Sequence, residues 1–437
     1  MAIFGPRTEN EPFYTSSPFE ALTGPVNSLE EIDLTDKALY TDGDFHSALR
    51  LLRREAPIFW HTKGTAKAFG DKSFWAVTSY EGFHQVIQNG KVFSSIHPVI
   101  DRTSEELGLR DLFFTMDGED HRSYRKPLER YTNVKAINAR QSTMDKSIRD
   151  DIAAFANSGA TDMAPLAYRI QVGLGIAFYD LEGKEAERLR LISEQLIGGS
   201  LDPHNVWDYA SSSAIADLVM LVEEILADRR QNPKDDIFTS LNMDEDAGRL
   251  THHQILTYLW FSISNVIGTA SNAAIYNPMI AMLHHPEQFQ LLREHPEHID
   301  SGRAADEALR WGGNSMHLCR LATADTEVLG QPIKKGEVVV AFQASANRDE
   351  TVFEDPYRFD VTKKRRRFAT FGTGMHQCIG MHMMRATATS VLRGLCESFE
   401  TIEQVGRVLH HIPYSLFNTE VASIPFRGTP ASTLEAR

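Results

Sequence analysis

The sequence predicts a mainly α-helical protein with small β-sheets, folded as a single large domain. The chain has 437 residues, of which 42% are hydrophobic and 24% charged, as in an ordinary globular protein with a large core. Helical periodicity dominates from about residue 36 onward, whereas strand-like runs are short and few. Pro, Gly, Asn and Ser are scattered through residues 1–35, so we expect a loosely structured N-terminal segment before a domain that spans 36–437.

The expected elements follow from the spacing of the apolar residues. Apolar residues at helical spacing predict helices over 46–55, 144–157, 184–197, 213–230, 252–284, 286–295 and 380–398. Short runs rich in β-branched and aromatic residues predict strands over 57–60, 74–78, 319–328, 338–342 and 421–425.

The stretch 252–284 is apolar on nearly all its faces, which is typical of a helix buried through the middle of a large protein. We expect one long helix there. Pro278 removes a backbone donor and should kink this helix or end it.

Charge and cysteine content narrow the function classes. The net charge of −14 disfavours non-specific binding of nucleic acid or of an anionic membrane. The N-terminus lacks a basic start followed by an apolar stretch, and no uninterrupted apolar run reaches about 18 residues, so we expect neither a signal peptide nor a membrane span. The only cysteines, Cys319, Cys378 and Cys396, form no CxxC pair, which argues against a disulfide scaffold and favours a cytoplasmic location.

The segment FATFGTGMHQCIGMHMM places a cysteine at the end of a glycine-punctuated turn, directly before a helix-like run. Cys378 at a helix N-terminus feels the positive end of the helix dipole, which favours the thiolate. Gly380 leaves room for a flat, bulky group near the backbone, and His376 could donate a hydrogen bond to an anion. A buried structural cysteine is the alternative interpretation. A zinc site is disfavoured because no second Cys/His pair lies at suitable spacing.

The spacing FGxGxHxCxG is filled at every position and resembles the haem-binding signature of the cytochrome P450 family. This resemblance implies the cytochrome P450 fold and a haem b whose iron is bound by the Cys378 sulfur, a ligand that favours cleavage of an O–O bond. Phe371 would shield the sulfur, and Gly372 and Gly374 would let the loop pass close beneath the porphyrin.

Other segments match the family in the expected order. Glu307 and Arg310 form an ExxR pair, which shares one helix face and which in the family locks to an arginine before the cysteine loop; Arg358 stands at that place. The segment MDGEDHRSYRKPLERYT resembles the helix that crosses the haem edge. The resemblance assigns the two haem propionates to His121, Arg125, Arg320 and His376. Taken singly, each could be an ordinary surface residue.

The central helix departs from the family pattern, because most members carry an acid followed by an alcohol that assist proton delivery. With the helix aligned on Pro286, the acid position falls on Thr269 and the alcohol position on Ala270, with Ser271 next. A shift of one residue places Thr269 at the alcohol position instead. No Asp or Glu occurs between Leu259 and His285, so Thr269 or Ser271 with ordered water, or a group on the substrate, must relay protons. Hydroxyls that only pack the helix are the alternative.

The resemblance also implies a substrate pocket above the haem and a redox partner. The expected pocket wall is Phe113, Phe114, Asn265, Thr269, Met316, His317 and Phe417, a few polar groups among apolar ones. A basic run interrupts the acidic chain before the cysteine loop and consists of Lys363, Lys364, Arg365, Arg366 and Arg367. This run would dock an acidic ferredoxin or flavodoxin. The alternative is that it is only a solvated face, as most charge runs are.

We therefore expect a haem-thiolate monooxygenase that inserts one atom of O₂ into a small organic substrate with electrons from that partner. The alternatives are a non-insertion oxidation on the same scaffold (coupling, desaturation, nitration or peroxide-driven chemistry) and a haem-binding sensor.

Overall fold

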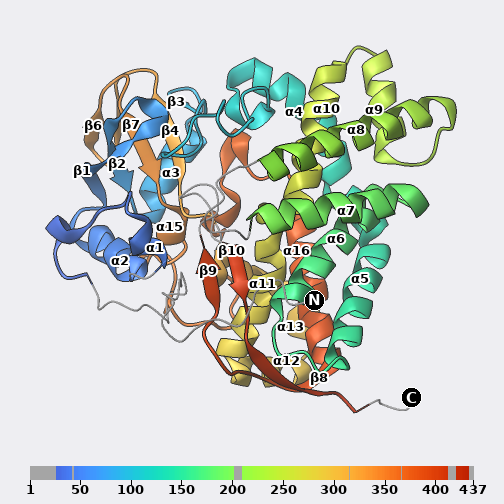
Figure 1. Ribbon diagram of the computed structural model, residues 1–437. Coiled ribbons are helices and arrows are strands. Elements are labelled where there is room, and N and C mark those ends of the chain that lie inside the picture. The colour runs from blue at the N-terminus through green and yellow to red at the C-terminus, as the bar shows by residue number, and fades with distance from the viewer. Residues whose placement is uncertain are drawn as a thin grey trace.

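The computed structural model describes residues 26–41, 44–200, 209–313, 315–365, 367–411 and 420–432. Helices make up most of the described chain, and one mixed sheet lies on the side opposite the helices α5–α8 (Figure 1). The predicted fold class is confirmed. The helices are α1 Lys37–Thr41, α2 Phe45–Glu55, α3 Tyr80–Gln88, α4 Gly118–Thr132, α5 Val134–Ala156, α6 Ala164–Tyr179, α7 Gly183–Ser200, α8 Tyr209–Gln231, α9 Ile237–Asp246, α10 His252–Val266, α11 Thr269–His284, α12 Pro286–Glu294, α13 Glu297–Asp300, α14 Arg303–Gly312, α15 Gln343–Ala346 and α16 Met381–Ser398.

The main sheet has the strand order β1-β2-β7-β4-β3 and joins the first quarter of the chain to the last third. Strand β2 pairs with β7 in parallel, whereas its other neighbour β1 is antiparallel. All four side chains of β7 are buried, which is why this strand reads as a continuous apolar run. The strands are β1 Ile58–Ala66, β2 Lys72–Val77, β3 Phe93–Ser94, β4 Leu318–Ala322, β5 Thr326–Val328, β6 Gln331–Ile333, β7 Val338–Ala341, β8 Phe399–Gln404, β9 Leu409–His411, β10 Glu420–Ser423 and β11 Phe426–Pro430.

The helical core is built around α11 and α16, which pack against each other and against α14, α5 and α6. Small residues let these helices approach closely. Ala273 and Ala274 of α11 are fully buried, and a Cβ on Gly312 of α14 would overlap the side chain of Asn277. No helix among the described residues has both the length and the apolar character that a membrane crossing requires.

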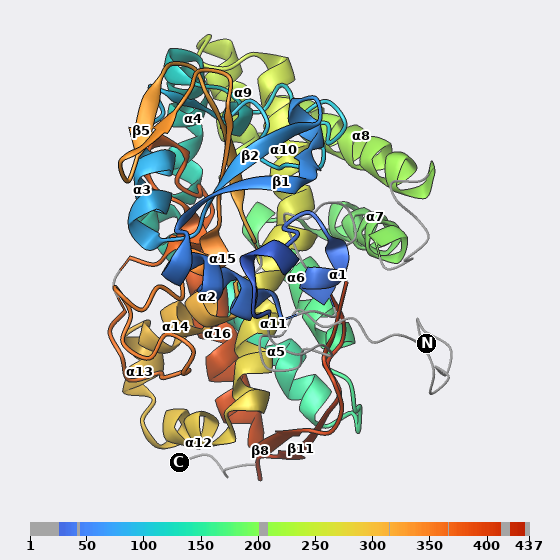
Figure 2. The ribbon, with the colours of Figure 1, turned by 90° about the vertical axis from the view of Figure 1, so that its left-hand side faces the viewer.

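The long central helix predicted over 252–284 is interrupted, so that prediction is wrong at its middle. Helix α10 ends at Val266 and α11 begins at Thr269, and the two follow one another through the molecule (Figures 1 and 2). The interruption lies at Ile267 and Gly268, because glycine is the poorest helix former after proline. Pro278, where we expected the kink, lies inside α11.

Two further boundaries differ from the prediction. The helix expected over 144–157 begins ten residues earlier, at Val134, where Asn133 caps it by accepting a hydrogen bond from Ala136 N–H. The strand expected over 319–328 is two strands, β4 and β5, which belong to different sheets. Residues 1–25 lie outside the described part of the chain, as does most of the N-terminal segment expected at 1–35.

Candidate active site around Cys378

The cysteine loop is a compact turn that enters α16. Two short 3₁₀ segments, η4 Ala369–Phe371 and η5 Gly374–His376, precede Cys378, whose N–H donates to the Phe371 carbonyl over 2.8 Å. Gly372 and Gly374 have φ of +61° and +71°, and a Cβ on Gly374 would lie 3.1 Å from Gln88 Cα. Glycine is needed at both positions because other residues avoid this backbone region. Gly380 is the N-cap of α16.

Cys378 is half-buried as a residue. Burial raises the pKa of this thiol, while the backbone N–H of Gly380 and the charge of Arg125 lower it. Such a thiol loses its proton when it binds a metal cation, because the cation supplies the missing stabilisation of the thiolate.

The structure brings the four residues assigned to the propionates toward one region beside this loop. The rings of His121 and His376 lie 4.3 Å apart, and no ring nitrogen of either has a hydrogen-bond partner among the described residues. Arg125 donates to the Met375 carbonyl over 3.1 Å. Arg320 is buried, which lowers its pKa to about 10, and its charge contributes to lowering the pKa of His376.

This cluster fits the carboxylates of a haem. Buried donors almost always have partners, and burying a charge without one is costly. His376 Nε2 is 3.8 Å from Asp117 Oδ1, too far for a hydrogen bond. An anionic group between these side chains would supply the acceptors that they lack.

The ion pair around Glu307 corrects one predicted partner. Glu307 and Arg310 are fully buried, and Arg310 binds Glu307 through two bonds of 2.7 and 2.8 Å. The arginine that completes the group is Arg365, which donates to both Glu307 oxygens over 2.8 and 2.9 Å. Arg358, the predicted partner, is exposed and contributes only its backbone carbonyl, because its turn directs the side chain outward.

The central helices present a partly exposed stripe. Phe261, Ser264, Asn265 and Gly268 keep some exposure, whereas Ile263, Val266 and Ile267 are buried. Positions at i, i+3, i+4 and i+7 share one helix face, so this face borders open space. The Asn265 amide donates to the Phe261 carbonyl over 2.8 Å, and the Phe261 ring stacks on Phe114 at 5.2 Å.

The other pocket residues have different surroundings. Phe113, Met316 and His317 are buried, and the Phe113 ring packs on His121 and Tyr124. Phe417 and the side chains of Thr269 and Ala270 lie outside the described part of the chain. Ser271 is buried, and its hydroxyl donates to the Val266 carbonyl over 2.5 Å.

The sequence interpretation missed Phe261 and Gln171. Phe261 could have been found, because it lies four positions before Asn265 on the same helix face. Gln171 donates from α6 to the Gly268 carbonyl. Its signal is a lone amide in the otherwise apolar run of α6.

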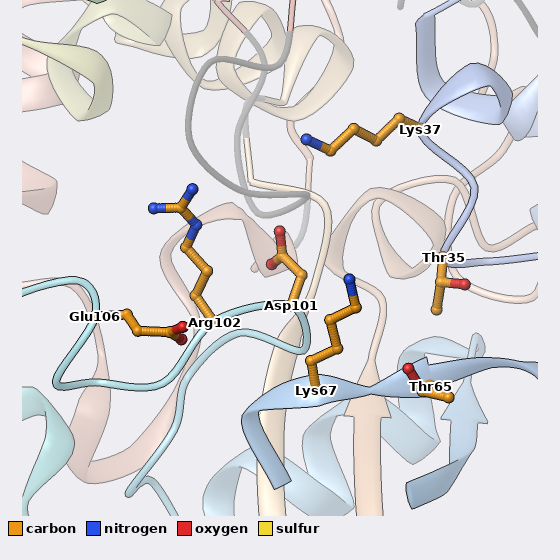
Figure 3. Close-up of a pocket in the computed structure, with 7 residues that line it drawn as sticks. All are labelled: Thr35, Lys37, Thr65, Lys67, Asp101, Arg102 and Glu106. Carbon is orange, nitrogen blue, oxygen red and sulfur yellow. The ribbon is translucent and has the colours of Figure 1, made fainter. Parts of the chain in front are cut away.

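A separate pocket of about 610 Å³ lies between the N-terminal segment, the end of β1 and residues 101–106 (Figure 3). It contains none of the predicted site residues. The residues that line it are Thr35, Lys37, Thr65, Lys67, Asp101, Arg102 and Glu106. Because the lining contains both cations and carboxylates, its charge selects no single class of ligand.

The predicted basic run is only partly available at the surface. The guanidinium of Arg365 is turned inward onto Glu307, and Lys363 is paired with Glu354 over 2.5 Å. Lys364 and Arg367 are exposed, and Arg366 lies outside the described residues.

Comparison with known proteins agrees with this geometry. The family model "Cytochrome P450" matches residues 303–414. The chain is 27% identical to steroid C26-monooxygenase of Mycobacterium tuberculosis, over 85% of this chain and 87% of that one. It is 26% identical to linalool 8-monooxygenase of Pseudomonas putida, over 91% and 100%.

The fold is shared with solved structures. CYP108D1 from Novosphingobium aromaticivorans superposes with a TM-score of 0.75 at 22% identity, over 88% of this chain and 94% of that one. P450 OxyD, which is involved in the biosynthesis of vancomycin-type antibiotics, gives a TM-score of 0.77 at 22% identity, over 91% and 100%. From the cysteine loop, the buried ion pair, the family match and these relatives, we conclude that the chain belongs to the cytochrome P450 family, whose members are haem-thiolate oxidoreductases.

Proposed function

We propose that this protein is a monooxygenase that inserts one oxygen atom from O₂ into a small, largely apolar substrate. The observation that carries the proposal is the half-buried Cys378 beside two histidines and two arginines. The histidines, His121 and His376, have buried ring nitrogens with no hydrogen-bond partner among the described residues. Haem, when bound, supplies the chemistry of O₂ activation. One oxygen atom enters the substrate and the other leaves as water, with two electrons from a donor protein and two protons from solvent.

The residues of the loop and its neighbours have distinct roles in this proposal. The Cys378 sulfur would bind the haem iron, and Phe371 would cover that sulfur. His121, Arg125, Arg320 and His376 would hold the two propionates through charge-assisted hydrogen bonds. The glycines of the loop have no side chains and would let the backbone pass close to the porphyrin.

The stripe on α10 supports an apolar substrate. The stacked rings of Phe114 and Phe261 form an aromatic wall, and Trp260 meets Phe261 edge to face at 6.0 Å. Asn265 supplies one polar group within this wall. Because the relatives include a steroid and a linalool monooxygenase, we propose a terpenoid or steroid-like substrate.

The decisive experiment is the spectrum of the reduced carbon-monoxide complex. The wild-type protein should show the strongly red-shifted band of thiolate ligation, and Cys378→Ala should abolish it. Cys396→Ala is the matched control, because Cys396 lies near the end of α16, the helix that follows the cysteine loop, and its replacement should leave the band unchanged. A folded protein that binds no haem would refute the proposal.

The substrate class is tested by the ferric spectrum. Testosterone and linalool are suitable first compounds, and a bound substrate should shift the spin state of the ferric, haem-loaded protein. A panel of steroids and terpenoids that gives no shift, when a different class does, would contradict the assignment.

A non-insertion oxidation is the second candidate, favoured by the absence of Asp and Glu between Leu259 and His285. Turnover under ¹⁸O₂ distinguishes the two reactions. Insertion places one heavy atom in the product, whereas coupling or desaturation places none.

For electron delivery, we propose that an acidic ferredoxin or flavodoxin docks near the cysteine loop at Lys364 and Arg367, the exposed members of the basic run. Reversing both charges should slow reduction and flatten its dependence on salt. Lys63→Glu on β1 is the control. Equal reduction rates in the double charge-reversal variant and in Lys63→Glu would exclude Lys364 and Arg367 as the docking surface.

A further inference from the structure

Helix α6 contacts the interruption between α10 and α11 from the side opposite the partly exposed stripe. Phe261, Ser264, Asn265 and Gly268 share the partly exposed face, while Val266 and Ile267 lie on the reverse face and are buried. Helix α6 packs on that reverse face. A Cβ on Gly175 of α6 would lie 2.6 Å from Ile267 Cγ2, so the two backbones come close there.

An interrupted helix leaves carbonyls without their usual partners, and these need other donors. At the end of α10, Ser271 supplies a donor to the Val266 carbonyl. At the start of α11, Gln171 of α6 donates to the carbonyl of Gly268, the N-cap residue, and so ties the interruption to α6. Because a carbonyl oxygen can only accept a hydrogen bond, the Gln171 atom that faces Gly268 must be the amide nitrogen, and this fixes the orientation of the amide group.

Gln171 is unusual in its surroundings. It is fully buried, and its neighbours on the inner face of α6, such as Ile170 and Leu174, are apolar. Its Oε1 has no hydrogen-bond partner among the described residues. A buried acceptor without a partner costs about 1–3 kcal/mol, and a water molecule is the usual remedy.

The Ser271 hydroxyl is committed to a carbonyl and has no second proton to give. The family's carboxylate is missing from this helix. We propose that Gln171 is a positioning residue that keeps the interruption open and holds a water molecule at its Oε1, and that this water delivers protons to the accessible face. The inference rests on the proposed monooxygenase function.

Protons balance without any change in Gln171. The water gives one proton toward the reacting oxygen and takes another from further water molecules that link it to bulk solvent, so the amide keeps both of its own. The role differs from that of a carboxylate, because an amide orients water but does not titrate near neutral pH.

The test uses haem-loaded protein reduced by a surrogate ferredoxin and its reductase without added substrate. Under these conditions the O₂ consumed leaves as hydrogen peroxide or, after further proton and electron delivery, as water. Gln171→Leu should raise the ratio of peroxide to water about tenfold, the order of effect for losing one ordinary hydrogen bond. It should also increase the solvent isotope effect on water formation.

Asn242→Leu is a closely matched control. Asn242 is also a buried amide that donates to a backbone carbonyl, that of Leu226, and its Oδ1 also lacks a partner among the described residues. It lies on α9, away from the interruption. Loss of stability alone would therefore affect both variants alike.

Two further readouts make the result decisive. Hydrogen exchange at residues 264–272 should accelerate in Gln171→Leu and not in Asn242→Leu. Gln171→Glu keeps the length of the side chain. It should make the ratio of peroxide to water depend on pH, with less peroxide where the carboxyl is protonated, because only the protonated form can donate to the Gly268 carbonyl. Equal peroxide ratios in the leucine variants, or a pH-independent ratio in Gln171→Glu, would overturn the inference. A normal carbon-monoxide band in these variants would leave the haem-thiolate assignment intact.

Discussion

Single residues decide how the cysteine loop is anchored. Glu307 is buried with two guanidinium groups bound to the same carboxylate, and the second comes from Arg365 in an irregular segment. The family resemblance placed this partner at Arg358, seven residues away. Glu307 and Arg310 were predictable as a pair because they lie three residues apart on one helix. Arg365 was not predictable, because in a segment without regular structure the sequence does not determine which side chain turns inward.

Replacing Arg365 by Met should destabilise the protein by about 3–5 kcal/mol, because it leaves a buried carboxylate with one of its two cationic partners missing. The free energy of unfolding in urea measures this. Arg358→Met, at the exposed position, should change it by no more than about 0.5 kcal/mol. Equal losses in the two variants would show that the assignment of partners is incorrect.

His61 should make the protein sensitive to acid. Its Nε2 accepts from Leu34 N–H over 2.9 Å, and burial, with a smaller contribution from Lys63, lowers its pKa to about 4. The unfolded chain binds this proton below about pH 6.5. The free energy of unfolding should therefore fall by up to about 1.4 kcal/mol per pH unit as the pH drops from 6.5 toward 4.

The His61→Gln variant isolates this contribution. Urea unfolding at pH 7 and pH 5 should show a smaller loss in the variant than in the wild-type protein. The exposed His253, replaced in the same way, should leave the loss unchanged. An identical pH dependence in wild type and His61→Gln would rule out the contribution.

At the scale of elements, apolar periodicity located helices and did not reveal where one of them is interrupted. The pattern passes through Ile267 and Gly268 without losing its period. Only glycine fits there, since a Cβ on Gly268 would lie 2.3 Å from the Ser264 carbonyl oxygen. The cysteine loop was predictable because its glycines, its cysteine and its helix start are all local in sequence.

Gly268→Ala should cost about 1–3 kcal/mol, since a backbone atom blocks the added methyl group and the interruption must shift. Gly173→Ala on α6 is the control, because its nearest neighbour is the Ser147 hydroxyl, which can rotate away, and alanine favours the helix. Thermal unfolding of both variants measures the difference. A Gly268→Ala variant as stable as Gly173→Ala would contradict the close approach.

At the scale of the whole molecule, a haem held as we propose would complete a polar cluster that the described residues leave unsatisfied. Within that part of the chain, His121 and His376 have buried ring nitrogens without hydrogen-bond partners, and Arg320 is a buried cation. The residues come from α4, the cysteine loop and β4, so a bound haem would connect the helical side with the sheet side.

Removing the haem should therefore lower the stability of the entire fold. A ligand present at a hundredfold excess over its Kd adds about 2.7 kcal/mol to the free energy of unfolding. His121→Phe should reduce the stability of the loaded protein and spare the haem-free protein, in which it removes an unsatisfied group. Urea unfolding with and without haem provides the measurement, and equal losses in both forms would contradict the role of His121.

The pairing of β2 with β7 has a consequence for biosynthesis. Phe74–Val77 lies beside Val338–Ala341 in parallel register, so the central strand of the sheet leaves the ribosome more than half a chain length after its neighbour. Until then the hairpin of β1 and β2 has an open edge, which is prone to pair with other chains. Slower translation between these segments should lengthen that exposure and reduce the soluble yield, whereas lower growth temperature or a chaperone that covers strand edges should restore it.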